Sequence, residues 1–152
     1  MEELNKVRNF LAQLPYKLEV IEFSQSTHTS ALAAEALGVT VGQIAKSLLF
    51  VGERGRALVV TSGDMRVNAK KLKALMGGKV KFAEEETVKE VTGFPPGGVC
   101  PFALKHPLKV YVDSSLERFP VVYAAAGTPN SAVPVTVQQL LEVTGGELCD
   151  LA

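Results

Sequence analysis

The sequence is poor in the residues from which metal and disulfide sites are built. It has no tryptophan, two histidines and two cysteines. Cys100 and Cys149 provide neither a disulfide framework nor zinc-finger spacing, so we interpret both as small buried apolar residues. His28 and His106 provide no spacing for a zinc site either. We interpret His106 as a surface histidine and His28 as a neighbour of a helix cap rather than a catalyst.

Long apolar runs and an excess of one charge are also missing. No apolar run approaches the roughly 18 residues of a membrane helix, and the N-terminal Met-Glu-Glu-Leu-Asn is acidic where a secretory signal is basic and then apolar. The formal net charge is zero, which argues against a surface that coats nucleic acid as a whole. With 152 residues, 47% apolar and 21% charged, we expect one soluble, cytoplasmic domain spanning residues 1–152, with no membrane partner.

Three common functional motifs are absent as well. No Gly-x-Gly-x-x-Gly follows an expected strand, no Gly-x-x-x-x-Gly-Lys-Ser/Thr is present, and there is no Gly-x-Ser-x-Gly. The absence of these motifs argues against the corresponding dinucleotide-binding proteins, P-loop nucleotidases and serine hydrolases.

The periodicity of apolar residues predicts helices and strands in irregular alternation. Helices are expected near Glu3–Leu14, Ser30–Leu37, after an Asn68 cap as far as Gly77, Glu84–Val91, and after a Thr136 cap as far as Gly145–Gly146, where the tail begins, with a helical turn at Ser114–Phe119. Strands are expected at Leu18–Phe23, Gln43–Val51, Ala57–Thr61, Val80–Phe82, Leu108–Val112, Val121–Ala125 and Val133–Val135. Because there is no regular βαβ repetition, we predict an α+β fold whose curved, barrel-like mixed sheet is largely antiparallel and flanked by helices.

A lysine lies on the apolar face of one expected strand. Alternation along Gln43–Val51 places Lys46 with Ile44, Leu48 and Phe50. An unpaired buried ammonium group is costly, so the side chain must reach water, pair with an anion or lose its proton. It either snorkels from the strand end or serves as a cation at the mouth of a pocket.

Two further segments have unusual composition. Thr92–Phe102 contains three glycines and three prolines between apolar anchors, which predicts a shaped loop that either presents backbone N–H groups to an oxygen or simply joins a helix to a strand. From Arg66 to Lys81 there are six basic residues and no acidic residue. This basic segment is either a solvated helix face or a site of phosphate contact.

Together these segments resemble the YbaK/ProX family, the free-standing relatives of the editing domain of bacterial prolyl-tRNA synthetase. The resemblance covers nearly the whole chain and rests on His28-Thr29, Ala33–Gly38, Ile44–Leu48, Gly63–Asn68, Lys70–Leu72, Thr92–Pro101 and Ala126-Gly127. It implies a metal-independent aminoacyl-tRNA deacylase without a cofactor, which acts in trans on the 3′ end of a mischarged tRNA.

The resemblance also suggests roles for individual residues. Lys46 matches the lysine that the family needs for activity, and the expected substrate-binding residues are Gly97, Gly98, Gly127, Thr128, Asn130 and His28. The segment Thr128–Asn130 departs from the alanine-specific and cysteine-specific members, so the amino acid remains open, with Ala, Cys or another small residue on tRNA-Pro expected. We expect phosphate contacts from Lys70, Lys71 and Lys73.

The chemistry of ester hydrolysis is compatible with this assignment. The glycine-rich loops can donate N–H groups to a tetrahedral oxyanion, and one such donor can contribute roughly 3 to 4 kcal/mol. Lys46 acts either as a cation or as a base, and we favour the cation. No residue stands out as a general base, so we expect the hydroxyl or phosphate of the substrate to help place the water.

Two other functions stay open, a non-catalytic tRNA- or synthetase-binding module of the same fold and a hydrolase of small esters or amides. The expected partners are the acceptor 3′ end of aminoacyl-tRNA and, in addition, a synthetase, with the protein a monomer or a homodimer.

Overall fold

The computed structural model describes residues 2–25 and 29–152. In these residues it contains α1 (Glu2–Ala12), α2 (Ser30–Leu37), α3 (Ala69–Met76), α4 (Glu85–Thr92) and α5 (Val137–Thr144), with 3₁₀ helices η1 (Val41–Gln43) and η2 (Ser114–Arg118). The strands are β1 (Ile21–Glu22), β2 (Ile44–Gly52), β3 (Gly55–Ser62), β4 (Val80–Phe82), β5 (Lys109–Asp113), β6 (Val122–Ala125), β7 (Ser131–Val135) and β8 (Glu147–Cys149).

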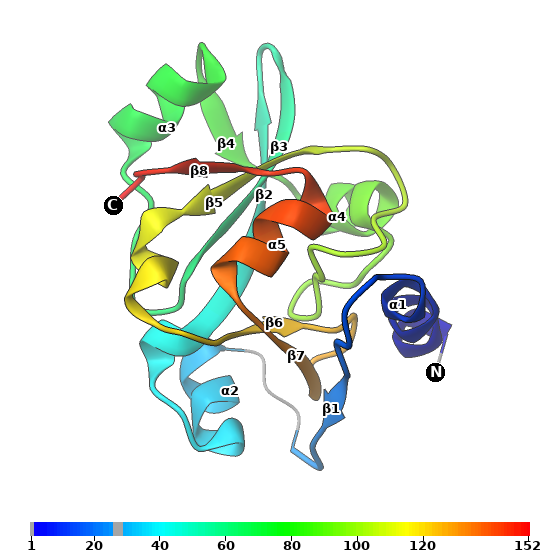
Figure 1. The fold of residues 1–152 in the computed structure, drawn as a ribbon. Coiled ribbons are helices and arrows are strands. Elements are labelled where there is room, and N and C mark those ends of the chain that lie inside the picture. Colours follow the sequence, from blue (N-terminus) through cyan, green and yellow to red (C-terminus); the bar gives the residue numbers. More distant parts are fainter. Residues whose placement is uncertain (1, 26–28) are drawn as a thin grey trace.

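All eight strands belong to one mixed sheet, which confirms the predicted α+β class (Figure 1). Its order is β1-β7-β6-β2-β3-β5-β8, and β4 pairs with β2 outside this path. The pairings β2–β6, β3–β5 and β5–β8 are parallel, and the other four are antiparallel. Strand β2 is central to the sheet, because it pairs with β3, β4 and β6.

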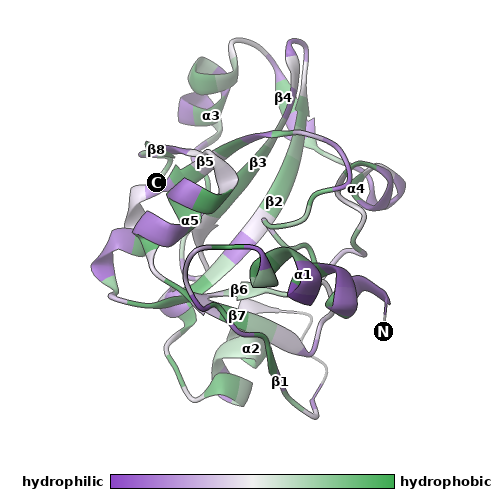
Figure 2. Ribbon diagram, turned by 45° about the vertical axis from the view of Figure 1, so that its right-hand side comes forward, coloured by the Kyte–Doolittle hydropathy of each residue, from purple (hydrophilic) through white to green (hydrophobic). Residues whose placement is uncertain are grey.

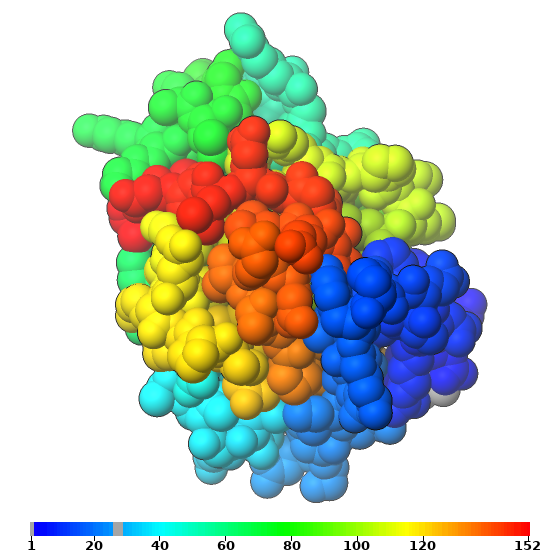
Figure 3. Space-filling model, in the orientation of Figure 1, coloured from blue at the N-terminus to red at the C-terminus, as the bar shows by residue number. Residues whose placement is uncertain are grey.

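Each face of the sheet has its own hydrophobic cluster. The larger cluster lies under α1, α4, α5 and the 93–102 loop, and it includes Val7, Leu58, Val91, Phe94, Phe102, Val112 and Leu140. Figure 3 shows the segment that follows α1 between α5 and α1 on this side of the molecule, and Figure 2 shows hydrophilic residues along α1 and α4, whose apolar residues pack inward. The smaller cluster lies on the other face under α3 and consists of Phe50, Ala57, Val59, Leu72, Tyr111 and Leu151.

Local capping explains why several helix boundaries were predictable. The side chains of Thr29, Asn68 and Thr136 each accept a backbone hydrogen bond at the start of a helix. Gly38 and Gly77 follow two of these helices in the left-handed conformation that favours glycine. Such signals lie within a few residues of the helix that they define.

Two predicted segments differ from the structure. The strand expected at Leu18–Phe23 is reduced to β1, which pairs only with β7 at the sheet margin. The residues after Gly145–Gly146, expected as a tail, contain β8, which pairs in parallel with β5. Asp113 holds this C-terminal segment in place, because its Oδ1 accepts a hydrogen bond from the backbone N–H of Leu151 at 2.6 Å.

No helix in the described part of the chain has both the length and the apolar character needed to cross a membrane.

Candidate functional site

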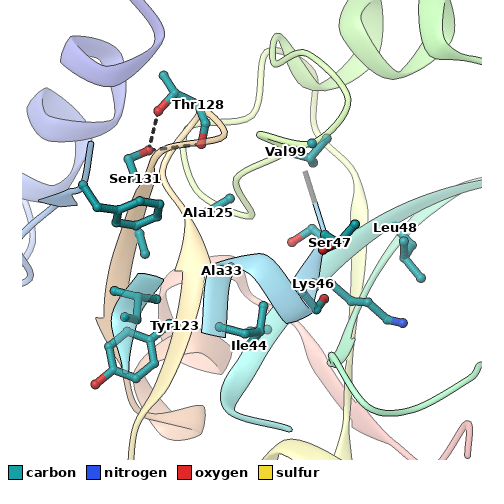
Figure 4. A pocket seen from close by; sticks show the side chains of 17 residues that line it. Ala33, Ile44, Lys46, Ser47, Leu48, Val99, Tyr123, Ala125, Thr128 and Ser131 are labelled. Atoms are coloured by element: carbon teal, nitrogen blue, oxygen red, sulfur yellow. Dashed lines mark hydrogen bonds between the residues drawn. The ribbon is translucent and has the colours of Figure 1, made fainter. Parts of the chain in front are cut away.

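The middle of β2 has a strand partner on one side only. From Ala45 to Gly52, β2 pairs with β3. On its other edge, Ile44 and Ala45 pair with β6, whereas residues 50–52 pair with β4. Residues 46–49 lie between these two partners. A cavity of about 250 Å³ opens at this unpaired edge, with walls from α2, β2, the 93–102 loop, β6 and the β6–β7 turn (Figure 4).

The peptide group of Ser47 faces this opening. The carbonyl of Ile44 accepts a hydrogen bond from Gly63 on the β3 side, whereas the carbonyl of Leu49 accepts one from Ala83 on the β4 side. Because peptide directions alternate along a strand in an antiparallel pair, the N–H and C=O of Ser47 point away from β3. This edge of β2 can therefore offer a backbone donor and a backbone acceptor to a bound molecule.

The hydroxyl of Ser47 also lacks a partner. Among the described residues, Ser47 Oγ is the one buried side-chain oxygen or nitrogen atom without a hydrogen bond. The side chain lies beside Val99 in the pocket wall (Figure 4). A buried hydroxyl without a hydrogen bond costs roughly 1 to 3 kcal/mol. The arrangement favours a ligand that supplies the missing bond.

Lys46 lies on the opposite face of β2, as alternation predicts. It pairs in register with the buried Thr61 and shares its face with Leu48 and Phe50, which belong to or pack against the smaller cluster. Figure 4 shows its amino group directed away from Thr128 and Ser131, toward the side of Leu48. Lys46 is also one of the lining residues, so it forms one edge of the cavity, and we call this edge the mouth.

Burial and two neighbouring charges set the pKa of Lys46. Burial lowers this pKa below the usual lysine value, the carboxylate of Asp64 opposes the effect, and the positive charge of Arg66 adds to it. Asp64 is itself held by Arg118, whose Nη2 donates to Oδ1 at 2.7 Å and whose Nη1 donates to Oδ2 at 3.2 Å. These hydrogen bonds hold the pKa of Asp64 below its usual value.

The two glycine-containing loops touch behind the cavity. A Cβ atom at Gly98 would lie 3.0 Å from the carbonyl carbon and oxygen of Gly127 and from Cα of Thr128. Gly97 lines the cavity and has a φ of 87°, in the left-handed region. The loop is anchored by the fully buried ring of Phe94. Glycine at 98 thus permits the close approach that joins the two loops.

The β6–β7 turn forms one wall of the cavity, and hydrogen bonds within the turn stabilise it. The hydroxyl groups of Thr128 and Ser131 are 2.7 Å apart, and Ser131 Oγ also donates to the Thr128 carbonyl at 3.2 Å. Asn130 takes part through its backbone, because its carbonyl accepts a hydrogen bond from Phe23 N–H at 3.0 Å. These polar groups are already paired, unlike Ser47.

The structure thus brings together most of the residues expected at the site. Lys46, Gly97 and Thr128 line the cavity, and Gly98 and Gly127 form the loop contact beside it. Asn130 lies in the same turn, and His28 falls outside the described residues.

The three lysines expected to contact phosphate lie on α3, away from the cavity lining. The side chain of Lys71 contacts the last residues of the chain. Its Nζ donates to the Ala152 carbonyl at 2.7 Å and lies 3.6 Å from Asp150 Oδ1. Lys70 and Lys73 are exposed. Within the described chain neither forms an ion pair, so these two are better placed than Lys71 to meet a ligand.

Ser47, Asp64 and Arg118 were not identified from the sequence as site residues. Ser47 follows Lys46 directly, but its lack of a hydrogen bond depends on tertiary structure. Asp64 and Arg118 come together from the end of β3 and from η2. Only the three-dimensional pairing of these segments could reveal the contact.

Neither cysteine is a candidate nucleophile. Burial raises the pKa of Cys100 to about 12 and that of Cys149 to about 11, so both thiols are protonated at neutral pH. Cys100 is fully buried, as predicted, whereas Cys149 is partly exposed. In residues 2–25 and 29–152, no group of three His, Cys, Asp or Glu side chains is arranged to hold a metal ion.

Comparisons with known proteins show which family the chain is similar to. The family profile described as "Aminoacyl-tRNA editing domain" matches residues 24–143. The uncharacterized protein YwhH of Bacillus subtilis (strain 168) is 41% identical over 140 residues, which cover 91% of this chain and 89% of that protein. A protein of Enterococcus faecalis provisionally named Cys-tRNA(Pro)/Cys-tRNA(Cys) deacylase EbsC is 25% identical over 141 residues, 91% of this chain and 86% of that one.

A solved crystal structure has a closely similar fold. It is described as that of a proposed trans-editing enzyme for prolyl tRNA synthetase, and it matches with a TM-score of 0.94 and 41% identity. The match covers 99% of this chain and 97% of the solved one.

Proposed function

The chain belongs to the aminoacyl-tRNA editing domain family, and on this premise we propose that it is a trans-editing deacylase that hydrolyses the ester of a mischarged tRNA-Pro. The name of the Enterococcus relative supports a deacylase, and the description of the similar crystal structure supports the connection with prolyl-tRNA synthetase. The reaction needs no cofactor in this proposal. A synthetase is a further expected partner.

One observation carries the proposal. Lys46, the unpaired hydroxyl of Ser47 and the glycine-rich loop meet at a single small cavity at the unpaired edge of β2. A non-catalytic docking surface requires neither a partly buried lysine nor a cavity of about 250 Å³. An aminoacylated tRNA end requires a recess for the small side chain of the amino acid and a cation near the phosphate of the terminal nucleotide.

The amino-acid part of the substrate fits the inner part of the cavity. Besides the aromatic Phe23 and Tyr123, its lining includes small and branched apolar side chains, among them Ala33, Leu37, Ile44, Val99, Ala125 and Ala132. Such a lining suits a small side chain such as that of Ala or Cys. The Ser47 hydroxyl and the peptide group of the same residue can hold the polar atoms next to the ester.

Hydrolysis then depends on stabilising the tetrahedral oxyanion. The Gly98 N–H already donates to the Pro95 carbonyl at 3.0 Å, so the candidate donors are the backbone N–H groups of Gly97 and Ser47. One such donor contributes roughly 3 to 4 kcal/mol when it is preorganised. Lys46, at the mouth, acts as a cation toward the terminal phosphate or the ester carbonyl. No residue of the described cavity lining is a carboxylate or a histidine, so we assign placement of the attacking water to the hydroxyl or phosphate of the substrate.

The test is deacylation of a panel of charged tRNAs by the wild type and by Lys46→Ala. Ala, Cys, Ser, Thr and Pro are each placed on tRNA-Pro and on their cognate tRNAs. We expect the wild type to hydrolyse one or a few of these esters and the variant to hydrolyse none. Retained hydrolysis in Lys46→Ala would contradict the assigned role of the lysine.

A second outcome would overturn the enzyme assignment itself. If the wild type leaves every ester at its spontaneous rate, the non-catalytic tRNA- or synthetase-binding module becomes the better explanation. A hydrolase of small esters or amides would instead act on a substrate without tRNA.

A further inference from the structure

Phe82 is exposed on an edge strand although its ring is held firmly in place. It is 64% exposed, the highest value among the exposed large hydrophobic residues of the described chain. Its ring centroid lies 4.6 Å from that of Phe50, with the planes tilted by 33°. Phe50 is only 4% exposed, so it supports Phe82 from the core side. One face of a fixed aromatic ring therefore remains open to solvent.

This ring is in line with the mouth of the cavity. Phe82 pairs in register with Phe50, and Phe50 shares its face of β2 with Leu48 and Lys46. Four residues at about 3.3 Å each separate Lys46 from Phe50 along the strand, or roughly 13 Å. Leu48 is partly exposed between them and belongs to the cavity lining. Figure 1 shows β4 beside the β2–β3 hairpin, at the end of the molecule away from α2.

Basic residues lie near the row formed by Lys46, Leu48, Phe50 and Phe82. Arg66 is exposed and lies near enough to Lys46 for its charge to lower the pKa of that lysine. Lys81 in β4 and Lys79 just before this strand are exposed as well, but alternation along β4 directs Lys81 to the face opposite Phe82. None of the three forms an ion pair with a described residue. The acidic start of α4, Glu84–Glu86, follows β4 closely in the chain.

We propose that Leu48, Phe82 and Arg66 form a track for single-stranded RNA, on which the unpaired nucleotides preceding the 3′-terminal adenosine lie. This inference rests on the proposed function, because it places the aminoacylated end in the cavity. A base stacks on the open face of Phe82, and Arg66 contacts a phosphate group. Aromatic stacking combined with cations along the backbone is the general way in which proteins hold single strands.

The track explains a feature that packing does not require. An exposed Phe on an edge strand could be replaced by a polar residue without leaving a hole in the core. A chain of a few nucleotides can span the roughly 13 Å from Lys46 to Phe50 and the strand spacing of about 4.8 Å from there to Phe82. The track would thus hold the acceptor end in a fixed register relative to Lys46.

The experiment compares Phe82→Leu, which removes the aromatic face, with Phe82→Tyr, which keeps it. Leu148→Ala, at an exposed apolar residue of β8, controls for the loss of any surface hydrophobe. The first readout is fluorescence anisotropy of a labelled, uncharged single-stranded RNA that ends in CCA. We expect Phe82→Leu to raise Kd about fivefold or more, with Phe82→Tyr and Leu148→Ala near the wild type.

The second readout is kcat/KM on aminoacyl-tRNA and on the same amino acid esterified to adenosine alone. We expect Phe82→Leu to lower kcat/KM on the tRNA and to leave the adenosine ester unchanged. Equal losses on both substrates, or unchanged binding of the RNA, would overturn the track. If the wild type hydrolyses neither ester, the proposed function fails, while the anisotropy measurement still decides whether Phe82 binds RNA.

Discussion

Arg118 holds Asp64 through two hydrogen bonds, at 2.7 and 3.2 Å, and Asp64 in turn raises the pKa of Lys46. The same guanidinium donates from Nη2 to Ser62 Oγ at 2.8 Å, and Ser62 donates to the Gly42 carbonyl. The Asp64 and Arg118 side chains are 39% and 46% exposed, so the pair contributes at most about 1 kcal/mol to stability. Its main effect is to fix a negative charge near the candidate catalytic lysine.

This relationship predicts a shift in the pH dependence of deacylation. Asp64→Asn keeps an acceptor for Arg118 but removes the negative charge, so the pKa of Lys46 falls further below its usual value. If the ammonium form is active, activity is lost as the pH rises through that pKa. The variant then loses activity at a lower pH than the wild type, and this is the result that we expect.

The profile also separates the two roles considered for Lys46. A neutral amine acting as base would instead gain activity as the pH rises, again at a lower pH in Asp64→Asn. The measurement is kcat/KM against pH, with Asp150→Asn as a control because Asp150 pairs with Lys71. An unchanged midpoint in Asp64→Asn would show that Asp64 does not act on Lys46.

Ser47→Ala should separate stability from activity. The substitution removes a buried hydroxyl that has no partner, so the free energy of unfolding should stay within about 0.5 kcal/mol of the wild type or rise. If the hydroxyl binds substrate, kcat/KM should fall by about tenfold. Urea unfolding and deacylation of the preferred ester provide the two measurements.

Ser131→Ala is the matched comparison for stability. It removes a hydroxyl whose partner, Thr128 Oγ1, lies at 2.7 Å in a buried position, so we expect the free energy of unfolding to fall by about 1 kcal/mol. A similar destabilisation in Ser47→Ala would mean that the Ser47 hydroxyl is satisfied after all.

Gly98→Ala should disturb the contact between the two loops. The new Cβ would approach the backbone of Gly127 and Thr128 at 3.0 Å, and backbone cannot move aside as a side chain can. We expect the free energy of unfolding to fall by about 1 to 3 kcal/mol, together with a reduced kcat. Thermal unfolding and single-turnover deacylation would measure both effects.

Gly78→Ala is a suitable control for that substitution. Its Cβ would meet the Glu53 carboxylate at 3.2 Å, the far end of a flexible side chain, and no positive φ is required. We expect near wild-type activity and stability from it. Equal behaviour of the two variants would argue against a tight contact at Gly98.

The basic face of α3 predicts a dependence of tRNA binding on salt. Replacing Lys70 and Lys73 together with Ala should reduce the slope of log K against log salt by about 0.7 to 0.9 for each phosphate that the variant no longer neutralises. Lys71→Ala, at the lysine held by Ala152 and Asp150, should leave the slope unchanged. Equal affinity and slope after all three substitutions would remove α3 from the interface.

Local signals account for what the sequence could predict. The bounds of α2 follow from Thr29 and Gly38, which lie next to it, and the face of Lys46 follows from simple alternation along β2. The glycine-rich loop could be recognised from composition alone. Each of these features is determined by residues within one helix, strand or turn.

The remaining features depend on pairing between distant segments. The parallel pairing of β8 with β5 has no local marker, because Glu147–Cys149 is short and does not alternate clearly. The same holds for the unpaired edge at Ser47, which exists only because β6 and β4 both pair with β2. Neither feature could be predicted from periodicity.

The pairing of β2 with β6 also fixes when the site can form during synthesis. Ile44 pairs with Tyr123, so a growing chain that has not yet reached β6 lacks one wall of the cavity. The β2–β3 hairpin can form early, because its contacts are local. Newly made chains therefore acquire a folded hairpin well before they acquire a cavity. Under the proposed function, hydrolytic activity should appear only when nearly the entire chain has left the ribosome.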